Sequence, residues 1–209
     1  MKTILCFGDS NTWGQDPETG QRYSRTVRWP GVLREKLGEG YVVIEEGLPG
    51  RTTVFRDPLE EYKCGKDYFA PCLQSHAPVD VVIILLGTND IQARYAASAL
   101  DIALGAGALV AIAQQSATGP DGMSPDVVLV APPPIKAVPE PWDETFAGGE
   151  EKSRRFAEHY QRIADLEYCA FFDAGQWITS SDTDGIHWDA SEHEKLGNVL
   201  AVEIRRLVG

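Results

Sequence analysis

Five short apolar runs, separated by longer stretches of mixed polarity, constrain this 209-residue chain more than any other feature of its sequence. The runs are rich in Val and Ile and lack the regular alternation of polar residues that a half-exposed strand shows. They span residues 3–7, 41–45, 79–86, 127–131 and, more weakly, 169–172. Runs of about 4–8 such residues are typical of strands that are covered on both faces. The sequence therefore predicts a parallel sheet of five buried strands.

Helical patterns lie between these runs. Apolar residues recur at helical spacing after Pro30 and across residues 99–115, 150–166 and 191–207. Ser191, followed by Glu194 three residues later, resembles a capping box at the start of the last helix. Strand–helix alternation of this kind predicts an α/β fold with helices on both faces of the sheet.

The chain contains no internal repeat or low-complexity tract, and its length suits one domain of about 150 residues or somewhat more. We therefore expect residues 1–209 to form a single domain. Segments 15–28, 51–66 and 132–149 lack periodicity, and long loops of this kind commonly serve function or subunit contacts.

The acidic composition excludes some partners. The formal net charge is −12, from 31 acidic and 19 basic residues. Proteins that bind nucleic acid or anionic membranes need a basic face, so we expect neither partner. A small, neutral or weakly charged substrate is the remaining expectation.

We expect a cytoplasmic protein. The apolar run at the amino terminus ends at Gly8, which is too short for a signal-peptide core of about 7–15 residues. The longest apolar stretch, residues 99–113, contains Asp101 and is shorter than the roughly 20 residues of a membrane span. The four cysteines show no CxxC spacing and are expected to be free thiols, although Cys64 and Cys72 could pair.

Polar clusters follow four of the predicted strands, at residues 8–11, 47–53, 87–90 and 182–189. Parallel strands place their carboxyl ends on one rim of a sheet, and ligands of open α/β sheets bind there. We therefore expect these four clusters to converge in space on one site.

Ser10 and His187 are the candidates for nucleophile and base in that site. Serine needs a base within hydrogen-bond reach, and Asp184, three residues before His187, can fix the imidazole tautomer. The alternative for Ser10 is a helix cap. The alternative for the acidic residues around His187 is a metal site, but no spacing typical of metal ligands supports it, so no metal is expected.

Asn89 and Gly50 are the candidate oxyanion donors, because an amide side chain and a backbone N–H can stabilise a tetrahedral intermediate without a full charge. Ordinary turn chemistry is the alternative for both. All the required roles occur at the ends of successive strands, and that coincidence favours the catalytic interpretation.

Four blocks of sequence resemble those of the SGNH (GDSL-type) hydrolases. They are Gly8-Asp9-Ser10, Gly50, Gly87-Thr88-Asn89-Asp90 and Asp184-Gly185-Ile186-His187. Flanking stretches, such as Arg51-Thr52-Thr53, are similar to the bacterial arylesterase/acyltransferase subgroup, which includes perhydrolases. Asn11 departs from the signature, which has leucine there.

The resemblance implies a three-layer α/β/α, flavodoxin-like SGNH fold whose five-stranded parallel sheet has the order 2-1-3-4-5. It implies that Ser10 is the nucleophile, His187 the general base and acid, and Asp184 its orienting partner. The oxyanion hole would combine the N–H groups of Ser10 and Gly50 with the Asn89 side chain. No cofactor is implied, and members of the subgroup are often homo-oligomers.

Asn11, Trp13 and Trp188 are the predicted pocket residues, since they adjoin Ser10 and His187 in sequence. Packing in the core or at the rim is the alternative for the two tryptophans. The predicted function is hydrolysis of short-chain acyl esters through an acyl-enzyme, with acyl transfer to an alcohol or peroxide as a further capability. The alternatives are a carbohydrate O-deacetylase of the same fold and a non-catalytic binding domain.

Overall fold

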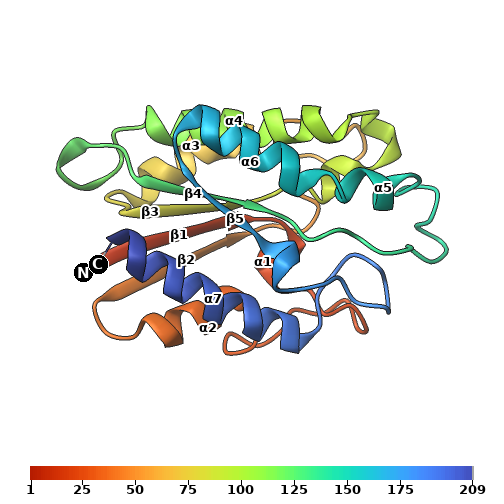
Figure 1. The fold of residues 1–209 in the computed structure, drawn as a ribbon, viewed down its shortest axis with the longest axis horizontal. Coiled ribbons are helices and arrows are strands. Elements are labelled where there is room, and N and C mark those ends of the chain that lie inside the picture. Colours follow the sequence, from red (N-terminus) through yellow and green to blue (C-terminus); the bar gives the residue numbers. More distant parts are fainter. Residues whose placement is uncertain (209) are drawn as a thin grey trace.

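A computed structural model describes residues 1–208, and its centre is a parallel sheet of five strands in the order β2-β1-β3-β4-β5 (Figure 1). The strands are β1 (Lys2–Gly8), β2 (Tyr41–Gly47), β3 (Val81–Leu85), β4 (Asp126–Ala131) and β5 (Ala170–Asp173). Every apolar run identified in the sequence forms a strand, and the predicted strand order is confirmed. The runs form strands because helices cover both faces of the sheet and exclude water from successive side chains.

Helices cover both faces of the sheet (Figure 1). Helices α2 (Trp29–Leu37) and α7 (Ala190–Val208) pack together on the first face, and α3 (Gly65–His76), α4 (Ala99–Gln114) and α6 (Phe156–Glu167) lie on the second. This is the predicted three-layer α/β/α arrangement. Within residues 1–208 no helix has the length and apolar character that crossing a membrane requires.

Short elements occupy the connections. Helices α1 (Ser10–Trp13) and α5 (Gly149–Ser153) are each about one turn long. Single turns of 3-10 helix are formed by Asn89–Ile91, Ala93–Tyr95, Pro120–Gly122 and Ala174–Gln176. Helices α1 and α5 both lie near the carboxyl ends of the strands, α1 near the middle of Figure 1 and α5 at its right.

Helix α3 was not predicted from the sequence. Pro71 lies in its interior, and a proline there removes a backbone N–H and disfavours a helix. The helix forms because Phe69, Cys72 and Leu73 are fully buried against the sheet, and this tertiary packing outweighs the cost of the proline.

The single helix predicted over residues 150–166 is wrong, because the chain forms α5 and α6 with a turn between them. Ser153 marks the break. Its hydroxyl donates to the carbonyl of Glu150 at 3.0 Å and accepts from the N–H of Ile135 at 3.1 Å. A serine bonded back to the preceding turn commonly bends or ends a helix.

The predicted cap of the last helix also differs from the structure. Helix α7 already begins at Ala190, and the Ser191 hydroxyl donates to Glu192 at 3.4 Å. A capping box is found at α4 instead. There the Ser98 hydroxyl accepts from the N–H of Asp101 at 3.1 Å, and the Asp101 carboxylate accepts from the N–H of Ser98 at 2.9 Å.

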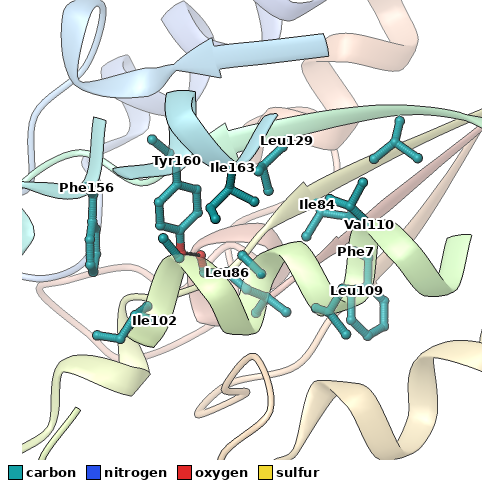
Figure 2. Close-up of a cluster of buried hydrophobic side chains, with 14 of the residues drawn as sticks. Phe7, Ile84, Leu86, Ile102, Leu109, Val110, Leu129, Phe156, Tyr160 and Ile163 are labelled. Carbon is teal, nitrogen blue, oxygen red and sulfur yellow. Dashed lines mark hydrogen bonds between the residues drawn. The ribbon is translucent and has the colours of Figure 1, made fainter. Parts of the chain in front are cut away.

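The strand side chains point alternately into two apolar cores. Leu5 and Phe7 of β1 face α3, α4 and α6, whereas Ile4 and Cys6 face α2 and α7. The first core is the larger, and Figure 2 shows part of it. Tyr160 of α6 is fully buried there, and its hydroxyl donates to the carbonyl of Leu86 at 2.7 Å (Figure 2).

The hydrogen bond of Tyr160 generates a prediction about stability. We expect Tyr160→Phe to lower the free energy of unfolding by about 1–3 kcal/mol, because the Leu86 carbonyl then stays buried without a partner. Urea unfolding followed by circular dichroism measures this change at constant m-value. Tyr168, which is 94% exposed, provides the matched control: Tyr168→Phe should change stability by less than about 0.5 kcal/mol. Equal stability of both variants would contradict the prediction.

Candidate active site

Ser10, His187 and Asp184 meet at the carboxyl ends of the strands, although 177 residues separate the first two in sequence. The Ser10 hydroxyl lies 2.9 Å from Nε2 of His187, and Nδ1 of His187 lies 2.6 Å from the Asp184 carboxylate. The carboxylate accepts from Nδ1–H, so Nε2 is left as the acceptor for the serine hydroxyl. The structure thus brings together the three side chains that the sequence predicted as a triad.

Asp184 also orders the loop that carries the histidine. Its Oδ1 atom accepts from the N–H groups of Ile186 at 2.9 Å and of His187 at 2.8 Å. Burial opposes ionisation of Asp184, but hydrogen bonds from His187 and the backbone outweigh it and lower the pKa of this carboxyl. Asp184 is therefore an ionised acceptor over the range in which a histidine titrates.

The turn from β1 into α1 presents Ser10. The Asp9 carboxylate accepts from the N–H of Asn11 at 2.9 Å and caps α1, which ends at Gly14 in a left-handed conformation. Position 8 requires glycine, because a Cβ atom there would lie 2.0 Å from the Thr12 hydroxyl. The tight turn leaves Ser10 at the first position of α1, where a backbone N–H has no partner within the helix.

Gly50 and Asn89 line the same cavity as Ser10. Gly50 has a φ of +77°, which favours glycine over any residue with a side chain. The Asn89 amide donates one hydrogen bond to the carbonyl of Arg51 at 3.0 Å. Since an amide nitrogen carries two hydrogens, the second remains for a ligand. The residues predicted as oxyanion donors therefore line one cavity together with Ser10.

The cavity at Ser10 has a volume of about 370 Å³. It is lined by Ser10, Gln15, Pro17, Gly50, Asn89, Gln92, Val138, Pro139, Trp142, Phe146, Asp184, Ile186 and His187. Four of the apolar lining residues belong to the long loop after β4, and of these four the sequence position had suggested only Trp142 as a pocket residue. Sequence reasoning missed most of these walls because loop side chains carry no periodic signal.

The three predicted pocket residues occupy other places. Asn11 is buried beneath the nucleophile turn, and its amide donates to the carbonyl of Ile186 at 3.4 Å. Trp188 is 1% exposed and packs in the core under α2 and α7. Trp13 lies beside Arg22, whose guanidinium is 5.2 Å from the ring centroid. Among residues 1–208, none of these three contributes to the lining of the cavity.

Two buried ionisable side chains, Arg51 and Asp90, connect the loops that form the site. Arg51 is 3% exposed, donates to the carbonyls of Gly8 at 2.9 Å and of Glu46, and lies over the ring of Phe7. Asp90 is fully buried and accepts from the N–H of Thr53, at 2.9 Å, and from the Thr53 hydroxyl. These bonds join the loops that follow β1, β2 and β3.

The acidic residues near His187 do not converge as metal ligands would. Asp182 is exposed and pairs with Lys136 at 2.7 Å, and Asp189 accepts from the Ser181 hydroxyl at 2.8 Å. Each carboxylate therefore has a separate role, and the arrangement favours the hydrogen-bonded triad.

The sequence and the fold both match known proteins. The GDSL-like lipase/acylhydrolase family matches residues 6–195. The native aryl esterase of M. smegmatis is 44% identical, with a TM-score of 0.95 over 99% of this chain and 100% of that one. A carbohydrate acetylesterase from Sinorhizobium meliloti is 40% identical, with a TM-score of 0.95 and the same coverage. A second carbohydrate acetylesterase family member from that organism is 35% identical, with a TM-score of 0.95 over 100% of both chains. No curated protein matches the sequence significantly.

The buried acids beneath the site generate a prediction about pH. Burial raises the pKa of Asp90 to about 7 and that of Asp9 to about 6; the donors on Thr53 oppose the shift at Asp90, and the charge of Asp9 adds to it. The ordinary pKa of 3.8 applies in the unfolded chain, so between about pH 4 and 7 the folded chain binds more protons. The stabilisation that comes from the higher proton affinity of Asp90 in the folded chain is therefore complete below pH 4, and it is lost as the pH rises through 7.

We expect Asp90→Asn to make the slope of unfolding free energy against pH more positive between pH 4.5 and 7. One proton accounts for at most about 1.4 kcal/mol per pH unit. Urea unfolding at several pH values measures the slope. Asp101→Asn is the control, because hydrogen bonds from Ser98 lower the pKa of Asp101 and confine its effect to lower pH. Parallel stability curves for the wild type and Asp90→Asn would refute the assignment.

Proposed function

The chain belongs to the GDSL-like lipase/acylhydrolase family and is an ester hydrolase, and we propose that it cleaves short-chain acyl esters through an acyl-enzyme on Ser10. The observation that carries this proposal is the continuous hydrogen-bonded series from Ser10 through His187 to Asp184. Because Gly50 and Asn89 line the same cavity, a bound ester would meet nucleophile and oxyanion donors together.

In the proposed mechanism, Nε2 of His187 takes the hydroxyl proton of Ser10 as its oxygen attacks the ester carbonyl. The N–H groups of Ser10 and Gly50 and the Asn89 amide bind the oxyanion, and a donor of this kind is worth about 10²–10³ in rate. His187 then gives the proton to the leaving alcohol. Water repeats the sequence on the acyl-enzyme, and Asp184 holds the imidazolium in place throughout.

The cavity supports a small acyl group. A volume of about 370 Å³ lies near the lower end of the range for ligand pockets, roughly 300–1,000 Å³. Trp142 and Phe146 give it apolar walls, while the Gln92 and Asn89 side chains add polar groups. This combination suits an acetyl or similar acyl chain on an uncharged alcohol.

Carbohydrate O-deacetylation is the second candidate function. The solved structures of a carbohydrate acetylesterase and of a carbohydrate acetylesterase family member resemble this chain at 40% and 35% identity, close to the 44% of the aryl esterase. The chemistry at Ser10 would be the same, and only the alcohol would differ. Comparing kcat/KM for acetate release from acetylated sugars and from aryl acetates separates the two candidates.

The proposal extends to acceptor, assembly and location. Alcohols or peroxide could replace water as the acyl acceptor, and product partition in water–alcohol mixtures tests this.

Leu100 and Leu104 of α4 are exposed apolar side chains, which supports a homo-oligomer that covers them. The four cysteines, all free, support a cytoplasmic location. One continuous sheet supports a single SGNH hydrolase domain over residues 1–209.

Ser10→Ala tests the nucleophile directly. We expect aryl acetate hydrolysis to fall by roughly 10⁶-fold, the scale reported for loss of a triad nucleophile. A serine-reactive phosphonate should label the wild type once and fail to label the variant. Ser24→Ala, at an exposed serine in another loop, should keep full activity and labelling. Activity that survives in folded Ser10→Ala would overturn the mechanism.

Asn89→Ala tests the oxyanion hole. We expect kcat to fall by about 10²–10³ with little change in KM, because the lost hydrogen bond matters most to the transition state. Steady-state kinetics with an aryl acetate measures both constants. Asn198→Ala on α7 is the matched control and should behave as the wild type. A rise in KM at constant kcat would instead assign Asn89 to substrate binding.

A further inference from the structure

A cluster of three potential metal ligands lies beside the edge strand β2. Glu46 is near the carboxyl end of β2, and Cys72 and His76 lie four residues apart on α3. Residues at that spacing share one face of a helix. One ligand atom of each of the three lies within 4.8 Å of the other two, and His76 Nε2 lies 2.8 Å from the Glu46 carboxylate.

We propose that Glu46, Cys72 and His76 form a binding site for a divalent transition metal, with Zn²⁺ as the preferred ion. A thiolate, an imidazole and a carboxylate are the three donor types that zinc uses in proteins. The hard cations Ca²⁺ and Mg²⁺ select oxygen ligands, so the sulfur and nitrogen donors disfavour them. Three protein ligands leave a fourth position for water or another ligand.

The distances between the three ligand atoms allow them to bind one ion after small movements of the side chains. Tetrahedral zinc with bonds of about 2.0–2.3 Å places its ligand atoms roughly 3.3–3.7 Å apart. Starting from separations within 4.8 Å, the sulfur must approach the other two atoms by at most about 1.5 Å, and the His76 and Glu46 atoms, now 2.8 Å apart, must separate by about 0.5 Å. The Glu46 and His76 side chains are 20% and 29% exposed, which leaves them free to rotate around the buried sulfur.

The charges of a loaded site balance. Zinc contributes two positive charges, and the Glu46 carboxylate and a Cys72 thiolate contribute two negative ones. The thiol proton leaves to solvent when the Zn–S bond forms. Arg51 donates to the backbone carbonyl of Glu46, whereas the Glu46 carboxylate lies against His76 within the cluster. A neutral complex does not repel the Arg51 guanidinium.

A cavity separate from the catalytic one lies against Glu46, one of the three proposed ligands. Its volume is about 500 Å³, and its lining includes Glu46, Arg51, Cys64, Asp67 and Tyr68. None of its lining residues also lines the cavity at Ser10. The metal can therefore reach the Glu46 carboxylate without passing through the ester site.

Cobalt(II), which takes the tetrahedral geometry of zinc and absorbs light, provides the probe. We expect the wild-type protein to bind one cobalt ion with a thiolate-to-metal absorption band in the near ultraviolet, and zinc to displace it. Cys72→Ser should abolish the band. His76→Ala and Glu46→Gln should weaken cobalt binding by at least about tenfold while keeping the band at saturation. His76 and Glu46 are partly exposed, so these two variants test the site even where Cys72→Ser unfolds.

Cys64→Ser is the matched control, since Cys64 lines the same cavity but donates its S–H to the carbonyl of Val54. It should leave the band and the affinity unchanged. The proposal is overturned if the wild type shows no thiolate band, or if the band follows Cys64. It is also overturned if cobalt binding persists in His76→Ala and is lost in His187→Ala, which would place the metal at the triad.

Discussion

The register of strand β1 between its two neighbours is the constraint on which the site depends. Gly8 pairs with Gly47 of β2 on one side and with Leu85 of β3 on the other. The three strands therefore end at the same level of the sheet, and the loops that follow them carry Ser10, Gly50 and Asn89. A shift of one residue in either pairing would turn every side chain of that strand to the opposite face. The apolar cores on both faces prevent such a shift, so core packing also fixes where the loops with the proposed oxyanion donors begin.

Buried polar side chains then hold the three loops against each other. Arg51 bonds to the chain before the nucleophile turn, Asn89 bonds to the carbonyl of Arg51, and Asp90 binds Thr53. A buried carboxylate is costly, and the raised pKa of Asp90 reflects that cost. The hydrogen bonds from the N–H and hydroxyl of Thr53 offset part of this cost. In return, they hold the loop after β2 against the loop after β3.

The sequence predicted the sheet and the triad because both carry strong local signals. Buried strands appear as apolar runs, and Ser10, Asn89 and His187 directly follow strands or stand in short recognisable blocks. Helix α3 was missed because Pro71 opposes it locally and only tertiary packing supports it. The wall residues Val138, Pro139 and Phe146 could not be predicted, because a loop without periodicity takes its shape from contacts with other segments. The cluster of Glu46, Cys72 and His76 was missed for the same reason. Glu46 on β2 meets the two residues of α3 only through a long-range contact, which has no local signal in the sequence.

Asn11 shows how a departure from the family signature can be accommodated. Leucine in this position could pack against the buried turn, but it could not reach a carbonyl with a hydrogen bond. The Asn11 amide donates to Ile186, the residue before His187, and so connects the nucleophile turn to the loop of the base. Within the described part of the chain its own carbonyl oxygen is buried without a partner, which costs about 1–3 kcal/mol. Asn11 thus adds a polar connection between the loops that carry Ser10 and His187, and the cost is its buried carbonyl oxygen.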